Sequence, residues 1–152
     1  MTFFLTDVVR STAMWDADPV SARSAIARHD EIVENSVGGC GGSLLKSRGE
    51  GDSHFAVFDH AQAATAAVLE IARTLTTEAW ETAQPLRVRM ALHTGTADVR
   101  GGDFYGPEVN RCARLRAIGH PGQSCSRTPL QHWFAPRAAG LRAAGARVAS
   151  PA

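Results

Sequence analysis

The sequence predicts an α+β fold in which helices pack on a central, mostly antiparallel sheet. Short apolar runs of strand type alternate along the chain with longer amphipathic stretches of helix type. The 152 residues are 44% hydrophobic and 20% charged, which is ordinary for one globular domain built around one core. We therefore expect a single domain and no second catalytic unit.

The first half of the chain is expected to form a strand, a helix and a hairpin. Residues 2–9 are a short β-type run. A helix capped by Asp18 or Ser21 follows, and it stops at a Gly-Gly pair. Strand-like runs at residues 43–48 and 53–58 flank a Gly-Glu-Gly turn, so these two runs predict a hairpin.

The second half continues the alternation of helices and strands. An alanine-rich helix is expected over about residues 60–75, and Pro85 then breaks the chain. Residues 86–93 alternate as a strand, residues 97–100 return as another, and a helix follows Gly106. This β-α-β-β-α-β order predicts a ferredoxin-like sheet that is covered on one side by helices.

The segment Gly102–Arg114 combines three polar side chains of different chemistry. Pro107 marks the first helical position, so Asn110 and Arg114 fall four residues apart on one helix face, and Asp103 precedes the helix. An amide beside a guanidinium suits a sugar or a phosphate, and a carboxylate accepts a hydrogen bond from a base amino group. The alternative is an ordinary amphipathic helix that buries only its apolar positions: Val109, Cys112, Ala113 and Leu115.

Two carboxylates are expected to meet where strands end. Asp7 closes the first strand and Asp52 opens the second arm of the hairpin, and a ferredoxin-like sheet places those strands side by side. Two like charges about 4 Å apart repel by several kcal/mol unless a cation lies between them. Oxygen ligands favour Mg²⁺ or Mn²⁺, and the turn after Asp7 could offer backbone N–H groups to phosphates. Each aspartate alone also fits a helix cap or a solvated turn.

Other chemical motifs lack supporting context. His29 and Asp30 could begin a metal-dependent phosphohydrolase site, but the sequence shows no partner histidine cluster. His93 fits a structural histidine at a strand end better than a catalytic base. The three cysteines are odd in number and widely separated, which argues against a disulfide framework and against a C-x-x-C metal site.

The charges are distributed unevenly. Nine Lys or Arg and fifteen Asp or Glu occur up to Glu108, whereas seven Arg and no acidic residue follow it. We expect a globular domain at residues 1–123 and an Ala/Arg/Gly/Pro-rich tail at 124–152 that is weakly structured or packed on the domain. The tail's arginines are sparse, so no nucleic-acid partner is expected. The sequence shows neither a membrane span nor an export signal, and we expect a cytoplasmic location without membrane attachment.

Taken together, these segments resemble the class III nucleotidyl cyclases of the bacterial adenylyl cyclase type. The matching segments lie within residues 3–123 and occur in the family's order: FFLTDVVRST, KSRGEGDSHFAVF, LRVRMALHTGTA and GGDFYGPEVNRCARLRAI. The resemblance implies a cyclase domain that converts ATP to 3′,5′-cyclic AMP and pyrophosphate in intracellular signalling. It also implies two bound divalent ions, Mg²⁺ or Mn²⁺.

The resemblance assigns the two metal ligands to the first strand and the hairpin. The first ligand maps onto Asp7. The hairpin carries two extra residues, so counting back from its end gives Asp52 and counting forward gives Glu50. We favour Asp52, because the family uses an aspartate there, and keep Glu50 as the alternative.

The resemblance also assigns the nucleotide contacts. Asp103 would recognise adenine together with Lys46 or Arg48, depending on the same register. Asn110 would orient the ribose, and Arg114 would neutralise charge on the α-phosphate. Because the family builds its sites between two subunits, the expected partners are ATP and a second copy of the chain or a second cyclase domain.

The chain departs from the family pattern after Gln123. The family continues with a strand and a hairpin that supply a phosphate-binding lysine, whereas no lysine follows Lys46 in this chain. A truncation or a shifted reading frame would give such a tail. A second hypothesis is therefore a degenerate cyclase-fold module that binds nucleotide or dimerises without turnover. A third, an RNA-binding ferredoxin-like domain, lacks the exposed aromatic pattern that it needs.

Overall fold

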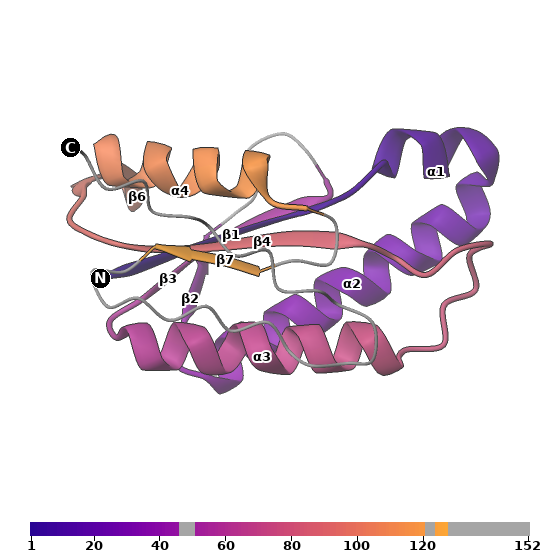
Figure 1. Ribbon diagram of the computed structural model, residues 1–152, viewed down its shortest axis with the longest axis horizontal. Coiled ribbons are helices and arrows are strands. Elements are labelled where there is room, and N and C mark those ends of the chain that lie inside the picture. Colours follow the sequence, from indigo (N-terminus) through magenta and orange to yellow (C-terminus); the bar gives the residue numbers. More distant parts are fainter. Residues whose placement is uncertain (46–50, 121–123, 128–152) are drawn as a thin grey trace, which may run out of the picture.

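The computed structural model describes residues 1–45, 51–120 and 124–127, and it has a five-stranded sheet with helices on both faces (Figure 1). The sheet order is β2-β3-β1-β4-β7, and all neighbours are antiparallel except β4 and β7. Its strands are β1 (Thr2–Val8), β2 (Ser43–Leu45), β3 (Ser53–Phe58), β4 (Val88–Thr94) and β7 (Ser124–Arg127). The helices are α1 (Ser11–Ala17), α2 (Pro19–Gly39), α3 (Ala61–Thr77) and α4 (Pro107–Ile118). A separate hairpin joins β5 (Asp98–Arg100) to β6 (Asp103–Tyr105).

The predicted α+β class is confirmed, but the prediction that helices cover one side of the sheet is wrong. Phe3 and Phe4 are adjacent in β1 and both are 0% exposed. Neighbouring residues of a strand point to opposite faces. Phe4 lies in the large core cluster with α2 and α3, whereas Phe3 packs with Cys112 of α4. Figure 1 shows α4 on one side of the sheet and α2 and α3 on the other.

Helix α2 begins at the cap that the sequence predicts. The Asp18 carboxylate accepts hydrogen bonds from the backbone N–H groups of Val20 and Ser21 at 3.1 and 3.2 Å, and Pro19 occupies the first turn. These bonds satisfy N–H groups that have no partner within the helix. The helix ends next to Cys40, directly after the predicted Gly-Gly stop.

Two elements differ from the sequence expectations. The segment after β1 is not only a turn, because Arg10 adopts a left-handed conformation (φ 61°, ψ 32°) and α1 begins at Ser11. Asp103 precedes α4 as expected, but it lies in β6, a strand that was not predicted and that pairs with β5. Gly101 and Gly102 connect these strands with positive φ angles of 60° and 79°, a conformation that glycine adopts without strain.

The sheet extends past residue 123, the predicted end of the domain. Ser124–Arg127 forms β7 and pairs in parallel with β4. The first four residues of the predicted tail thus join the sheet, and residues 128–152 lie outside the described residues. Within the described part of the chain, none of the helices combines the length and the hydropathy that a membrane span requires.

Candidate functional site

Asp7 lies at the end of β1, between β3 and β4. It is opposite Ser53 on one side and Arg89 on the other. Arg89 donates through Nε to Asp7 Oδ1 at 2.9 Å, and its Nη2 makes a close ion pair with Oδ2. Nε of Arg116, from α4, lies 3.9 Å from Oδ2. The Asp7 side chain is only 14% exposed, so two guanidinium groups neutralise a largely buried carboxylate.

Asp52 lies directly beside this strand end. Its carbonyl oxygen accepts a hydrogen bond of 3.1 Å from the N–H of Val8, and the residue is half-buried. The sequence prediction that the Asp7 and Asp52 strands are neighbours is therefore confirmed. The other hairpin candidates, Lys46, Arg48 and Glu50, lie outside the described residues.

Arg89 and Arg116 are site residues that sequence reasoning missed. The hydrogen bonds from Arg89 to Asp7 raise the pKa of the guanidinium above its ordinary value. Arg116 Nε is buried and has no hydrogen-bond partner among the described residues. Arg89 is 82 positions from Asp7 in sequence, so only the pairing of β1 with β4 reveals the contact. The one available signal was an arginine inside an otherwise apolar strand.

Helix α4 separates its arginines between two faces. Arg116 points toward Asp7, whereas Asn110 and Arg114 are exposed. Two residues along a helix correspond to about 200° of rotation, and four residues return to nearly the same face. The predicted pairing of Asn110 with Arg114 on one face thus agrees with α4. Arg116, not Arg114, is the α4 arginine beside Asp7 within one chain.

Helix α4 is anchored to the end of β4 by Glu108. Its carboxylate makes a close ion pair with Nε2 of His93, which is 7% exposed, and accepts a 2.6 Å hydrogen bond from Arg111. These contacts lower the pKa of Glu108, with the His93 hydrogen bond as the largest cause. Gly95 permits the close approach, because a Cβ there would lie 2.6 Å from Cγ of Glu108.

Asp103 is held on the same face of the sheet by the β5–β6 hairpin. The ring of Phe104 packs with its centroid 6.4 Å from those of Phe3 and Phe55. The Asp103 carboxylate accepts hydrogen bonds from the Phe104 N–H at 3.0 Å and from the Tyr105 hydroxyl at 3.3 Å. Asp103 is half-buried, and its backbone is fixed by the hairpin.

A cavity of about 690 Å³ opens between α1 and the segment that leads into β4. Its lining comes from the ranges Val9–Ser21 and Thr82–Arg87. None of the sequence-predicted site residues that the structure describes lines this cavity. The cavity is therefore not formed by the predicted site residues, although its lining residues Val9 and Arg87 lie two positions from Asp7 and Arg89.

The Asp7 and Asp52 carboxylates fit a hard divalent cation by their chemistry. Both are oxygen donors, and the hydrogen bond between Val8 and Asp52 brings their strands together. Arg89 currently holds both oxygens of Asp7. A cation would therefore compete with this guanidinium for the Asp7 carboxylate.

The sequence of this chain is similar to those of several known proteins. No family model matches the chain. An uncharacterized protein of Mycobacterium tuberculosis is 38% identical over 123 residues, which cover 81% of this chain and 41% of that protein. An adenylate cyclase of Neurospora crassa is 28% identical over 81% of this chain and 6% of its own length. The chain thus spans less than half the length of each of these two relatives.

Solved structures share the fold. An adenylate cyclase from Trypanosoma brucei in its monomeric state has a TM-score of 0.75 at 24% identity, covering 81% of this chain and 71% of that one. An adenylate/guanylate cyclase/hydrolase from Silicibacter pomeroyi has a TM-score of 0.62 at 26% identity, covering 83% and 75%. This chain therefore shares its fold with class III adenylate and guanylate cyclase catalytic domains, and its sequence is similar to those of adenylate cyclases.

Proposed function

We propose that this chain is a nucleotidyl cyclase domain that converts ATP to 3′,5′-cyclic AMP and pyrophosphate in intracellular signalling. The observation that carries the proposal is the position of Asp7. Its carboxylate lies between Arg89 and Arg116 at one end of the sheet, where the backbone of Asp52 is hydrogen-bonded to the next residue, Val8. Acidic and cationic groups together at a strand end suit a substrate that carries phosphates and divalent cations.

In this proposal Asp7 and Asp52 hold two ions, Mg²⁺ or Mn²⁺. When bound, the ions activate the 3′-hydroxyl of the ribose and neutralise charge on the phosphates. Arg89 leaves the Asp7 carboxylate when Asp7 becomes a ligand. Its freed guanidinium would then be available to bind phosphate oxygens with its fixed fork of donors.

The remaining groups come from α4 and from the β5–β6 hairpin. Asn110 would orient the ribose and Arg114 would neutralise the α-phosphate, in accord with their shared exposed face. Because this face points away from Asp7, we propose that a second copy of the chain supplies them. Asp103, with Lys46 or Arg48, would recognise the adenine amino group and ring nitrogen.

The direct test is turnover by the purified protein with Mn²⁺ and either ATP or GTP. Cyclic product is identified by mass spectrometry, and Asp7→Ala serves as the blank. We expect cyclic AMP from the wild type and none from the variant. Equal traces of product from both proteins would rule out the enzyme proposal. ATP binding without product would instead support the second candidate, a non-catalytic cyclase-fold module, for which the departure after Gln123 is the motivating observation.

The role of Arg114 is tested by its kinetic signature. Arg114→Ala should lower kcat by roughly 10²-fold to 10³-fold, by analogy with the loss of one preorganised donor, and should change ATP binding far less. Arg111→Ala is the matched control, because Arg111 is also exposed on α4 but pairs with Glu108. An equal loss of binding and turnover in Arg114→Ala would contradict a role confined to the transition state.

The shared site is tested by mixing two inactive variants. A heterodimer of Asp7→Ala with Arg114→Ala contains one intact site, because each subunit supplies what the other lacks. Random exchange should therefore restore about a quarter of wild-type activity, since half of the dimers are mixed and each has one of two sites. Continued inactivity of the mixture, with exchange verified by mass spectrometry, would exclude the shared site while leaving the wild-type assay unaffected.

A further inference from the structure

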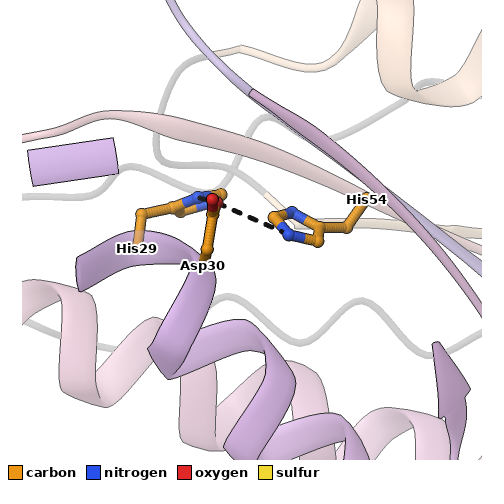
Figure 2. A group of neighbouring side chains, drawn as sticks. All are labelled: His29, Asp30 and His54. Carbon is orange, nitrogen blue, oxygen red and sulfur yellow. Dashed lines mark hydrogen bonds and ion pairs between the residues drawn. The ribbon is translucent and has the colours of Figure 1, made fainter. Parts of the chain in front are cut away.

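A second polar cluster lies on the opposite face of the sheet from Asp7. His29 and Asp30 come from α2 and His54 from β3, and Figure 2 shows the three side chains converging. Nδ1 of His29 lies 3.0 Å from Oδ1 of Asp30, and Nε2 of His54 lies 3.4 Å from the same oxygen. The sequence alone shows no partner histidine cluster for His29 and Asp30. The fold supplies His54, 24 positions after Asp30.

The cluster does not include Asp7, which lies on the other face of the sheet. His54 pairs with Thr6 across the β1–β3 ladder, whereas Asp7 pairs with Ser53. Because directly opposed residues share a face and successive residues alternate, His54 and Asp7 lie on different faces. His54 accordingly faces α2, and Asp7 faces α4.

Two of the three distances between the candidate ligand atoms are close to those of a tetrahedral cation site. Zn²⁺ binds imidazole nitrogen and carboxylate oxygen at about 2.0–2.2 Å, which sets neighbouring ligand atoms roughly 3.3 Å apart in a tetrahedron. The distances of 3.0 and 3.4 Å match this value, and one atom from each of the three residues lies within 4.8 Å of the others. Two imidazoles and a carboxylate form a donor set that zinc uses in proteins.

Both imidazoles can present a lone pair to a cation. His29 is 0% exposed and His54 is 8% exposed. The far ring nitrogens, Nε2 of His29 and Nδ1 of His54, are buried without a hydrogen-bond partner among the described residues. Without a cation, the Asp30 carboxylate favours a proton on the near nitrogen of His29, with which it forms a 3.0 Å hydrogen bond. A bound cation would replace that proton, and each ring would then carry its proton on the far nitrogen.

We propose that His29, Asp30 and His54 bind a divalent transition-metal cation, with Zn²⁺ as the best fit. Asp30 is 34% exposed at its side chain, which gives the cation a path from solvent and leaves room for a water ligand. The site joins α2 to β3 and is structural rather than catalytic. The far nitrogens lack the acceptors that usually strengthen histidine ligands, so we expect binding about 10- to 100-fold weaker than at a fully supported site.

The test uses the whole chain with Zn²⁺ or Co²⁺ alone, without nucleotide. We expect Zn²⁺ to raise the thermal midpoint of unfolding with the logarithm of its free concentration above the Kd. We expect Co²⁺ to give the visible absorption bands of tetrahedral nitrogen and oxygen coordination. An intense near-ultraviolet thiolate band would assign the metal to cysteine and overturn the proposal. Absence of both signals would also overturn it.

Variants distinguish this site from the proposed catalytic one. Asp30→Asn and His54→Gln should each abolish the Zn²⁺-dependent stabilisation, whereas Asp7→Asn should retain it. His60→Gln is the matched control, because His60 is an exposed histidine at the start of α3. If Asp30→Asn binds Zn²⁺ like the wild type, the proposal fails. Asp30 is partly exposed, so this variant remains informative even if His54→Gln does not fold.

Discussion

Replacing Arg89 by methionine should destabilise the fold more than replacing its partner Asp7 by asparagine. Arg89→Met removes the guanidinium that binds both carboxylate oxygens of Asp7. It leaves a carboxylate that is 14% exposed, and among the described residues Arg116, at 3.9 Å, is the cation that remains paired with it. Asp7→Asn instead leaves a guanidinium that is 29% exposed and more easily hydrated. The loss of stability is larger when the less exposed charge, that of Asp7, is left without its partner.

The magnitude follows from the burial of the pair. Losing one partner of a fully buried ion pair costs about 3–5 kcal/mol, and an exposed pair contributes only about 0–1 kcal/mol. Because Asp7 is mostly buried and Arg116 remains, we expect about 2–3 kcal/mol for Arg89→Met and about half of that for Asp7→Asn. With a urea m-value of about 1–3 kcal/mol per molar, the Arg89→Met midpoint should fall by roughly 1–2 M.

Urea unfolding at pH 7 without divalent ions measures these values. Arg87→Met is the control, because Arg87 is exposed on the same segment and its carbonyl contact with Val9 does not involve the side chain. The double variant completes a thermodynamic cycle that isolates the pairwise coupling of Arg89 and Asp7. A coupling energy below about 0.5 kcal/mol, or an Arg89→Met effect no larger than that of Arg87→Met, would refute this account of the pair.

Three further predictions concern packing, pH and thiol chemistry. Gly42→Ala should lower the free energy of unfolding, measured in urea, by about 1–3 kcal/mol, because a Cβ there would lie 2.4 Å from the Phe58 ring. Gly38→Ala is the control and should not lower it, because a Cβ at Gly38 meets no atom within 4 Å. Equal effects of the two substitutions would contradict this account. The pKa of Glu108 is lowered from 4.5, so its stabilisation is present at higher pH and lost as pH falls through its folded pKa. The difference in urea midpoint between wild type and Glu108→Gln should therefore shrink below about pH 4.5, and a constant difference would contradict the assignment. Burial raises the pKa of the Cys112 thiol to about 12, so iodoacetamide at pH 8 should label it only in urea, and native labelling detected by mass spectrometry would contradict its burial.

The strands and long helices were predictable because each carries a clear local pattern. The predicted bounds of 53–58 match β3, and the Asp18 cap and Pro107 mark the observed starts of α2 and α4. Helix α1 was missed because it buries no residue and so has no apolar periodicity. Strand β6 was also missed, although its signal was present, since the Gly-Gly pair before Asp103 is typical of a tight hairpin.

The candidate site was predictable only where its residues lie in family motifs or at strand ends. Asp7 and Asp52 were identified from the ends of two strands, and the structure places those strands side by side. Arg89, Arg116 and His54 were not identified, because their roles depend on contacts between distant segments. The adjacent Phe3 and Phe4 were the sequence signal for a sheet buried on both faces, and a single amphipathic face was the wrong interpretation.

In a strand that is apolar on both faces, the hydrophobic pattern favours no single register, and polar residues can determine it. A one-residue slip of β1 exchanges its two faces, and with Phe3 and Phe4 both buried the hydrophobic pattern alone opposes this slip only weakly. Among the described residues, the cationic partners of Asp7, Arg89 and Arg116, lie on the α4 face, and His54 meets Asp30 on the α2 face. A one-residue slip between β1 and β4 would turn Asp7 toward the α2 face and separate its carboxylate from Arg89 and Arg116. The ion pair between Asp7 and Arg89 therefore favours the observed register of β1 against β4.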